Sequence, residues 1–137
     1  MDRSHVDGPH AGVPTGCRLE LLDSIAYATP AMAGAVIVSG SHGGLSAARF
    51  AAEARPHLAV FNDAGGGLDD AGVSGLAWLA EQGIAAAAVG HMTARIGEAR
   101  STLADGVVTR VNAPAAALGV RCGMRCAQAV AVACGQP

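Results

Sequence analysis

Short apolar runs alternate with longer segments of helical spacing through most of this chain, and this alternation limits the fold more than any other feature. The runs Ala35–Val38, Leu58–Phe61 and Ile84–Val89 are apolar at consecutive positions, as in strands that are buried on both faces of a parallel sheet. A weaker run covers Val107–Val111, and Leu19–Leu22 is a candidate edge strand. Strands separated by helices predict βαβ units with right-handed crossovers.

Three segments between these runs have the spacing of amphipathic helices. The first stops at Arg55-Pro56, because the residue before a proline disfavours the helical conformation. The second stops at Gly83, and the third, from about Thr93 to Ala104, stops at Gly106, where a glycine cap is typical. A further short helix is expected from about Met124 to Cys134. The apolar positions that predict the three helices are Leu45, Ala48 and Ala52; Val73, Leu76, Ala77 and Ala80; and Ile96, Ala99 and Leu103.

These elements predict an α/β fold, a three-layer sandwich with a mostly parallel sheet of four or five strands, Rossmann-like or flavodoxin-like. The chain has 137 residues, of which 51% are hydrophobic and 15% charged, as expected of one globular domain. We expect residues 18–137 to form this domain and residues 1–17 to be a disordered N-terminal segment. Two Phe, one Tyr and one Trp leave few large side chains for a core, so we expect a homo-oligomer that buries further surface.

Composition and charge argue against several functions. All nine basic residues are Arg, and the formal net charge is -2 without a basic tract, which disfavours nucleic acid as a partner. The absence of Lys excludes Schiff-base and P-loop chemistry. The apolar runs are far shorter than the roughly 20 residues that span a bilayer, and the first residues lack a secretory signal, so we expect a cytoplasmic protein without membrane segments. The four cysteines match no zinc motif and are expected to be reduced and structural: Cys17, Cys122, Cys126 and Cys134.

Polar residues with chemical potential gather in the segments 39–44, 62–70 and 90–95, which follow the three buried strands. In an open parallel sheet, ligands bind outside the carboxyl ends of the strands, where such segments converge. We therefore expect one polar site that binds a small molecule. Its candidate catalytic residues are Ser41, His42, Asp63 and His91, and its candidate substrate-binding residues are Gly43, Gly44, Asn62, Asp69, Asp70 and Arg95.

Each candidate has a chemical role and a structural alternative. His42 and His91 would move protons, and Asp63 would accept a proton or orient an imidazole. Backbone N–H groups of residues 40–44 would hold an oxyanion, and Arg95 would bind a substrate carboxylate. The structural alternatives are hydrogen-bonded histidines, an Asx turn at Asp63, helix caps at Ser41, Asp69 or Asp70, and an ion pair of Arg95 with Asp63 or Asp70.

Three short motifs lie in these segments: Ser41-His42-Gly43-Gly44, Asn62-Asp63-Ala64-Gly65 followed by Asp69-Asp70-Ala71-Gly72, and Ala94-Arg95-Ile96-Gly97. Together they resemble the signature of a group of small, uncharacterised bacterial α/β proteins. The resemblance covers roughly residues 22–124. It implies one polar site and does not imply a particular reaction.

The leading hypothesis is a small-molecule enzyme, a hydrolase or lyase that acts on a compact substrate bearing a carboxylate or amide. A variant uses Ser41 as the nucleophile, because Ser39–Gly43 nearly matches G-x-S-x-G and the order Ser41, Asp63 or Asp69, His91 is that of α/β-hydrolases. No cofactor is identified. A divalent metal has suitable donors in His42, His91, Asp63 and Asp69 or Asp70 but is not favoured. The non-enzymatic alternative is a metabolite-binding or subunit module that uses the same loops.

Overall fold

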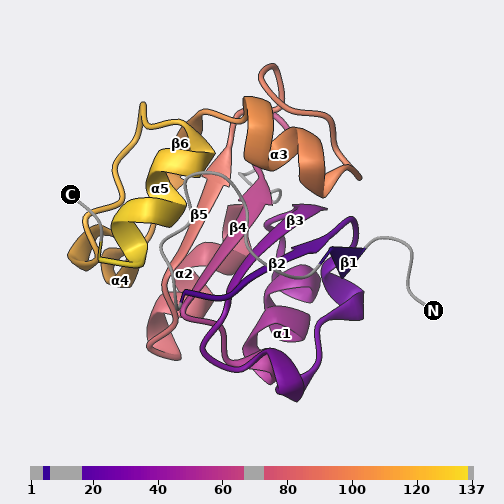
Figure 1. The fold of residues 1–137 in the computed structure, drawn as a ribbon, viewed down its shortest axis with the longest axis vertical. Helices are drawn as coiled ribbons and strands as arrows, with labels where there is room; N and C mark the ends of the chain where they lie inside the picture. The colour runs from indigo at the N-terminus through magenta and orange to yellow at the C-terminus, as the bar shows by residue number, and fades with distance from the viewer. Residues whose placement is uncertain (1–4, 7–16, 67–72, 136–137) are drawn as a thin grey trace.

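The computed structural model describes residues 5–6, 17–66 and 73–135, and its centre is a six-stranded sheet (Figure 1). The strands follow one another across the sheet in chain order. The pairs from β2 to β5 are parallel, and the two outer pairs, β1 with β2 and β5 with β6, are antiparallel. The strands are β1 (His5–Val6), β2 (Leu19–Leu22), β3 (Val36–His42), β4 (Leu58–Asn62), β5 (Ala86–Val89) and β6 (Val108–Val111).

Helices pack on both faces of the sheet and complete three layers (Figure 1). On one face, α1 (Leu45–Ala54) and α2 (Ser74–Glu81) share a core with Phe61 of β4. On the other face, α3 (Ala99–Asp105), α4 (Ala113–Ala117) and α5 (Cys126–Ala133) share a second core with Val38 and Val60. Consecutive parallel strands joined by crossovers of one hand keep α1 and α2 on the same face. Two short 3₁₀ turns, η1 (Ile25–Tyr27) and η2 (Pro30–Met32), join β2 to β3.

The predicted three-layer α/β sandwich with a mostly parallel sheet is confirmed. The narrower Rossmann-like or flavodoxin-like assignment is not confirmed, because those folds reverse their strand order at a switch point. Here the strand order is sequential, and the second face is covered by helices that follow β5. Leu19–Leu22 is not an edge strand, since it lies between β1 and β3 and is buried throughout. Of residues 1–16, only His5–Val6 lies within the described ranges.

The ends of the first two helices confirm the sequence prediction. α1 stops just before Arg55-Pro56. At the end of α2, Gly83 has a φ of 76°, a conformation that side chains disfavour. The backbone N–H groups of Gly83 and Ile84 donate to the carbonyl oxygens of Ala80 (3.0 Å) and Leu79 (2.9 Å). This is the Schellman arrangement in which a glycine ends a helix.

The third predicted helix starts later than its spacing indicates. α3 begins at Ala99, and residues 93–98 form turns. The carboxylate of Asp23, from the distant turn after β2, accepts the N–H of Ala99 at 2.9 Å and so caps the helix there. The Thr93 hydroxyl accepts the N–H of Val107 at 3.0 Å. Thr93 therefore belongs to the turn before the helix and not to its first turn. Ile96 is therefore 55% exposed and does not lie on a buried helix face.

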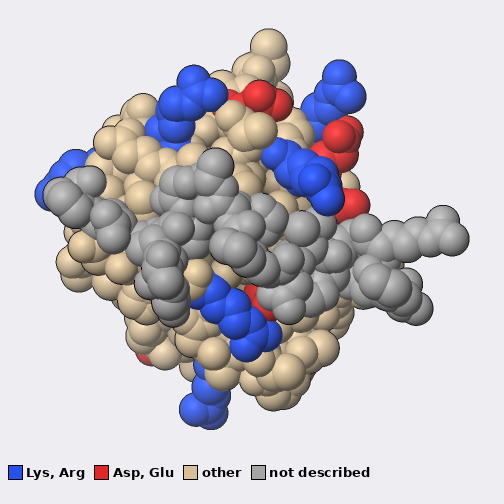
Figure 2. Space-filling view, viewed as in Figure 1, with Lys and Arg blue, Asp and Glu red and all other residues tan. Residues whose placement is uncertain are grey.

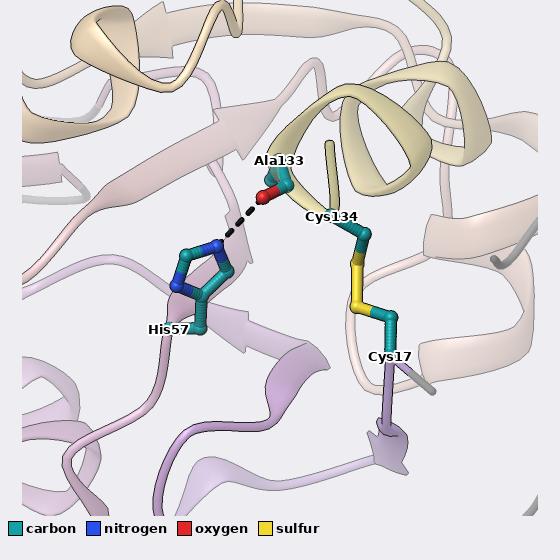
Figure 3. Close-up of a disulfide and its surroundings, with 4 residues drawn as sticks. All are labelled: Cys17, His57, Ala133 and Cys134. Carbon is teal, nitrogen blue, oxygen red and sulfur yellow. Dashed lines mark hydrogen bonds between the residues drawn. A yellow bond between two sulfur atoms is a disulfide. The ribbon is translucent and has the colours of Figure 1, made fainter. Parts of the chain in front are cut away.

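A disulfide joins the two ends of the described domain (Figure 3). Cys17, just before β2, bonds to Cys134, just after α5, with a Cα–Cα distance of 5.9 Å. Beside it, the His57 ring nitrogen Nε2 lies 2.6 Å from the carbonyl oxygen of Ala133. The expectation that these two cysteines are reduced is therefore wrong. Because structural disulfides are rare in reducing compartments, the bond does not favour the cytoplasmic location, which stays a prediction.

The remaining two cysteines carry free thiols, as predicted. Burial raises the pKa of the Cys126 thiol to about 12, because the charged thiolate loses its hydration. Cys126 therefore stays protonated and serves packing. Cys122 is exposed.

Charged side chains are sparse and lie mainly at the surface. On the face shown in Figure 2, arginine side chains stand apart from one another and acidic side chains lie beside several of them. Glu20 of β2 is buried instead and accepts a hydrogen bond from Nε of Arg18 at 2.7 Å. Arg18 also donates to the carbonyl oxygen of Ala31, so the pair connects β2 to η2. Among the described residues, no helix is both long and apolar enough to cross a membrane.

Candidate functional site

The segments that follow β3, β4 and β5 contact one another at the carboxyl ends of these strands. The N–H of Gly43 donates to the carbonyl oxygen of Asn62 at 3.2 Å, and the Asn62 side chain donates to the carbonyl oxygen of Ala94 at 3.1 Å. The N–H of Gly97 donates to the carbonyl oxygen of Gly40 at 2.7 Å. The predicted convergence of the three loops is therefore confirmed.

Asp63, directly after β4, is the best-connected polar side chain at this edge. Its Oδ1 accepts the N–H of Gly65 at 2.8 Å and the backbone N–H of His91 at 3.0 Å. The same oxygen lies 3.3 Å from Nδ1 of the His91 ring. Its Oδ2 accepts the hydroxyl of Thr109 at 2.7 Å. Three segments therefore fix both oxygens of a carboxylate whose side chain is only 10% exposed.

These hydrogen bonds lower the pKa of Asp63. Burial alone would raise the pKa, because the charged form loses hydration. The N–H of Gly65, the hydroxyl of Thr109 and the two N–H groups of His91 stabilise the carboxylate, and together they outweigh burial. Asp63 is therefore ionised at neutral pH.

We expect Asp63 to make stability depend on acidic pH. Because its pKa is lower in the folded protein than in the unfolded chain, its contribution is fully present above the ordinary pKa of about 4. The contribution is lost as the pH falls through the lower pKa of the folded state. Urea unfolding of the wild type and Asp63→Asn at pH 7 and below about pH 4 measures this, and the difference in free energy of unfolding should shrink with acidification. A difference that stays constant would contradict the assignment. Asp105→Asn, at an exposed carboxylate, is the matched control.

The bond to Asp63 determines which nitrogen of His91 carries a proton. Because a carboxylate only accepts, Nδ1 must be the protonated nitrogen, and Nε2 of the neutral ring is left with a free lone pair. A Cβ at Gly65 would lie 3.4 to 3.6 Å from three ring atoms, and Gly65 has a φ of 75°. The loop therefore lies in contact distance of the ring, and the positive φ is what favours glycine at position 65. The His91 side chain is still 46% exposed, so the ring is both fixed and accessible.

Ser41 and His42 occupy a neighbouring part of the edge. The Ser41 oxygen accepts the N–H of Ile25 at 2.9 Å, and Nδ1 of His42 accepts the N–H of Gly44 at 3.1 Å. Within the described part of the chain, neither residue hydrogen-bonds to His91. Gly44 is the N-cap of α1, and no side chain caps this helix. The structure therefore supports neither a Ser41 nucleophile paired with His91 nor a Ser41 cap on α1.

Three residues predicted to bind substrate have structural roles. Asn62 is fully buried, and its Oδ1 accepts the N–H of Ala64 at 2.8 Å. The N–H groups of Gly43 and Gly44 are already bonded, to Asn62 and to His42. Because these groups are occupied within the fold, the predictions that Asn62 contacts a substrate and that these two N–H groups hold an oxyanion are wrong.

Arg95 lies in the segment after β5 and is exposed. Its guanidinium lies 3.8 Å from the Glu98 carboxylate, and its side chain is 81% exposed. The alternative of an ion pair between Arg95 and Asp63 is therefore wrong, and a contact with substrate stays a prediction. Asp69 and Asp70 lie outside the described residues.

Thr109 is a site residue that sequence reasoning missed. The antiparallel return of β6 beside β5 brings Thr109 to Asp63. Gly90 leaves room for this contact, since a Cβ there would lie 3.1 Å from the Thr109 methyl group and 3.9 Å from Oδ2 of Asp63. In the sequence, the only sign of this role is that Thr109 places a hydroxyl within the run Val107–Val111.

No family model, curated protein or solved structure matches the chain. The resemblance to small bacterial α/β proteins stays a prediction from the motifs. Across residues 5–6, 17–66 and 73–135, no cluster of three or more His, Cys, Asp and Glu side chains is placed to hold a metal ion.

Proposed function

We propose that the protein is a small-molecule enzyme, a hydrolase or lyase, in which His91 acts as general base toward a compact substrate with a carboxylate or amide. The observation that supports this proposal is the shared carboxylate oxygen. Oδ1 of Asp63 lies within hydrogen-bond distance of both the backbone N–H and the ring Nδ1 of His91. A carboxylate in this position orients an imidazole and stabilises the imidazolium that forms when the ring takes a proton.

The proton would pass to Nε2 of His91, while Nδ1–H stays on Asp63. In a hydrolase, the proton would come from a water whose oxygen bonds to the substrate carbonyl carbon. The C–N or C–O bond of the amide or ester would then break, and Nε2 would return the proton to the leaving nitrogen or oxygen. In a lyase, it would come from the carbon next to the carboxylate, and the electron pair of that C–H bond would expel the leaving group. Both reactions need a base that is accessible but does not rotate. Thr109 and Gly65 hold the Asp63 carboxylate in place, and the carboxylate in turn would hold the His91 ring. Arg95 would hold the substrate carboxylate.

We expect His91→Ala to lower kcat/KM by about 100-fold or more, because a positioned general base commonly contributes that much. The substrate would come from a screen of esters, amides and carboxylates with a β leaving group. Asp63→Asn should also lower kcat/KM, because the amide does not carry the negative charge that stabilises the imidazolium. His57→Gln is the matched control, since a glutamine can still donate to the carbonyl oxygen of Ala133. Unchanged turnover in His91→Ala would rule out the proposed role and favour a binding module.

The predicted homo-oligomer belongs to the same proposal. The composition of the two cores supports it, because their buried residues are largely Ala and Val and Phe61 is the largest fully buried side chain. A small domain with such a core gains stability by burying further apolar surface.

A further inference from the structure

A cleft of about 390 Å³ lies at the carboxyl ends of β2 and β3. Its walls are the turn after β2, the end of β3, one side of α1 and residues 96–97. At Gly40, which lines the cleft, a Cβ would collide with the backbone of Gly97 and Glu98. The end of β3 therefore packs directly against residues 97–98 at this wall of the cleft. Its lining does not include Asp63, His91 or Thr109, so a ligand bound there would serve a function beyond the proposed reaction.

Three side chains in the cleft offer hydrogen-bond donors. The Ser41 oxygen accepts the N–H of Ile25, so its own hydrogen is left for a ligand. His42 accepts a hydrogen bond at Nδ1, so the neutral ring carries its hydrogen on Nε2. Ser46 is exposed and makes no hydrogen bond within the described residues. Donors from β3 and α1 therefore favour an acceptor group such as a carboxylate.

The cleft also contains an acceptor and apolar surface. Oδ1 of Asp23 accepts the N–H of Ala99, and Oδ2 has no partner within the described residues. A negative oxygen with a free lone pair favours an ammonium group. Phe50 and Ile96 line the same cleft and are 42% and 55% exposed. Large apolar side chains left open to water in a cleft favour an apolar ligand group.

We propose that this cleft binds a free apolar α-amino acid. The ammonium group would bind Asp23, the carboxylate would bind Ser41, His42 and Ser46, and the side chain would pack on Phe50 and Ile96. An α-amino acid carries both charges on one carbon. In the cleft, the acceptor Asp23 follows β2 and the donors Ser41 and His42 end β3. These neighbouring strands lie about 4.8 Å apart, and Ser46 of α1 adds a third donor. The volume is within the range of about 300 to 1,000 Å³ for small-molecule sites.

The first test is a titration of the full chain with L-phenylalanine, followed by ¹H–¹⁵N NMR. Saturable shifts at the amides of Ser41, Ser46 and Gly97 are expected, with a Kd of roughly millimolar, as is usual for a ligand of this size. N-acetyl-L-phenylalanine lacks the ammonium group, phenethylamine lacks the carboxylate and L-alanine lacks the large side chain. Each should bind about tenfold or more weakly, because each loses one of the three contacts. No saturable shift with L-phenylalanine, or equal binding of all four compounds, would overturn the proposal.

Two glutamate variants separate the cleft from the rest of the surface. Phe50→Glu removes an apolar wall and places a charge in the cleft, so binding of L-phenylalanine should weaken about tenfold or more. Met92→Glu makes the same change at an 85% exposed apolar residue outside the cleft lining and should leave binding unchanged. Equal effects of the two variants would contradict the assignment. Binding should persist in His91→Ala, so this result and the proposed catalysis are decided separately.

Discussion

Replacement of both Cys17 and Cys134 by serine is expected to lower the free energy of unfolding by about 4 to 5 kcal/mol. The bond closes a loop between residues 117 positions apart. In the chain-entropy treatment, a cross-link across about 100 residues restricts the unfolded chain by about 4.7 kcal/mol. A domain of this size is commonly stable by only about 5 to 15 kcal/mol. The double variant should therefore lose between about a third and nearly all of its stability.

Urea unfolding at pH 7 measures this effect in the wild type and the double serine variant. Dithiothreitol should lower the stability of the wild type toward that of the variant and leave the variant unchanged. Cys122→Ser, at the exposed free thiol, is the control and should change the free energy of unfolding by less than about 0.5 kcal/mol. An equal loss in Cys122→Ser and in the double variant would show that the cross-link is not the cause.

The Asn112→Ala variant should lose about 3 to 5 kcal/mol of stability. Asn112 is 8% exposed and uses its whole side-chain amide. Its Oδ1 accepts the N–H groups of Ala86 (2.9 Å) and Ala115 (3.1 Å), and its Nδ2 donates to the carbonyl oxygens of Leu76 and Ile84, both at 3.0 Å. One side chain thus joins the start of β5 to α2 and α4. Its removal takes away four hydrogen bonds, and each such bond contributes about 0.5 to 1.5 kcal/mol to stability.

Thermal and urea unfolding of two further variants tests this explanation. Asn112→Asp keeps the two bonds that Oδ1 accepts and loses the two bonds that Nδ2 donates. Its free energy of unfolding should therefore still fall, because the carbonyl oxygens of Leu76 and Ile84 lose their donor. Gln82→Ala removes an exposed amide and should stay within about 0.5 kcal/mol of the wild type. A loss below about 1 kcal/mol in Asn112→Ala would show that water replaces the four bonds at little cost.

The sequence predicted those parts of the fold that depend on local pattern. Consecutive apolar residues identified β4 and β5, and Pro56 and Gly83 identified two helix ends. Contacts between distant segments were not predictable in this way. The start of α3 depends on Asp23, which is 76 residues away from Ala99. The antiparallel direction of β6 relative to β5 could not be predicted either, because the residue pattern of a strand is the same in parallel and antiparallel pairing.

The candidate site divides along the same line. Asp63 and His91 were predicted because they directly follow the ends of buried strands, and the structure brings them together. His42 followed the same rule but is itself the last residue of β3, after an irregularity in the pairing with β4. It therefore faces the neighbouring cleft with Ser41. Substrate binding by Asn62 was wrongly predicted, because the sequence does not distinguish an asparagine that shapes a turn from one that binds a ligand.

The tautomer of His91 shows whether Asp63 orients the His91 ring. Long-range ¹H–¹⁵N NMR of the neutral imidazoles distinguishes a proton on Nδ1 from a proton on Nε2. His42 accepts at Nδ1 and the Nε2 of His57 faces a carbonyl oxygen, so both should carry the proton on Nε2 and serve as internal references. If Asp63 orients His91, the His91 ring should carry its proton on Nδ1 and revert to the Nε2 form in Asp63→Ala. An Nε2 proton on His91 in the wild type would contradict the account.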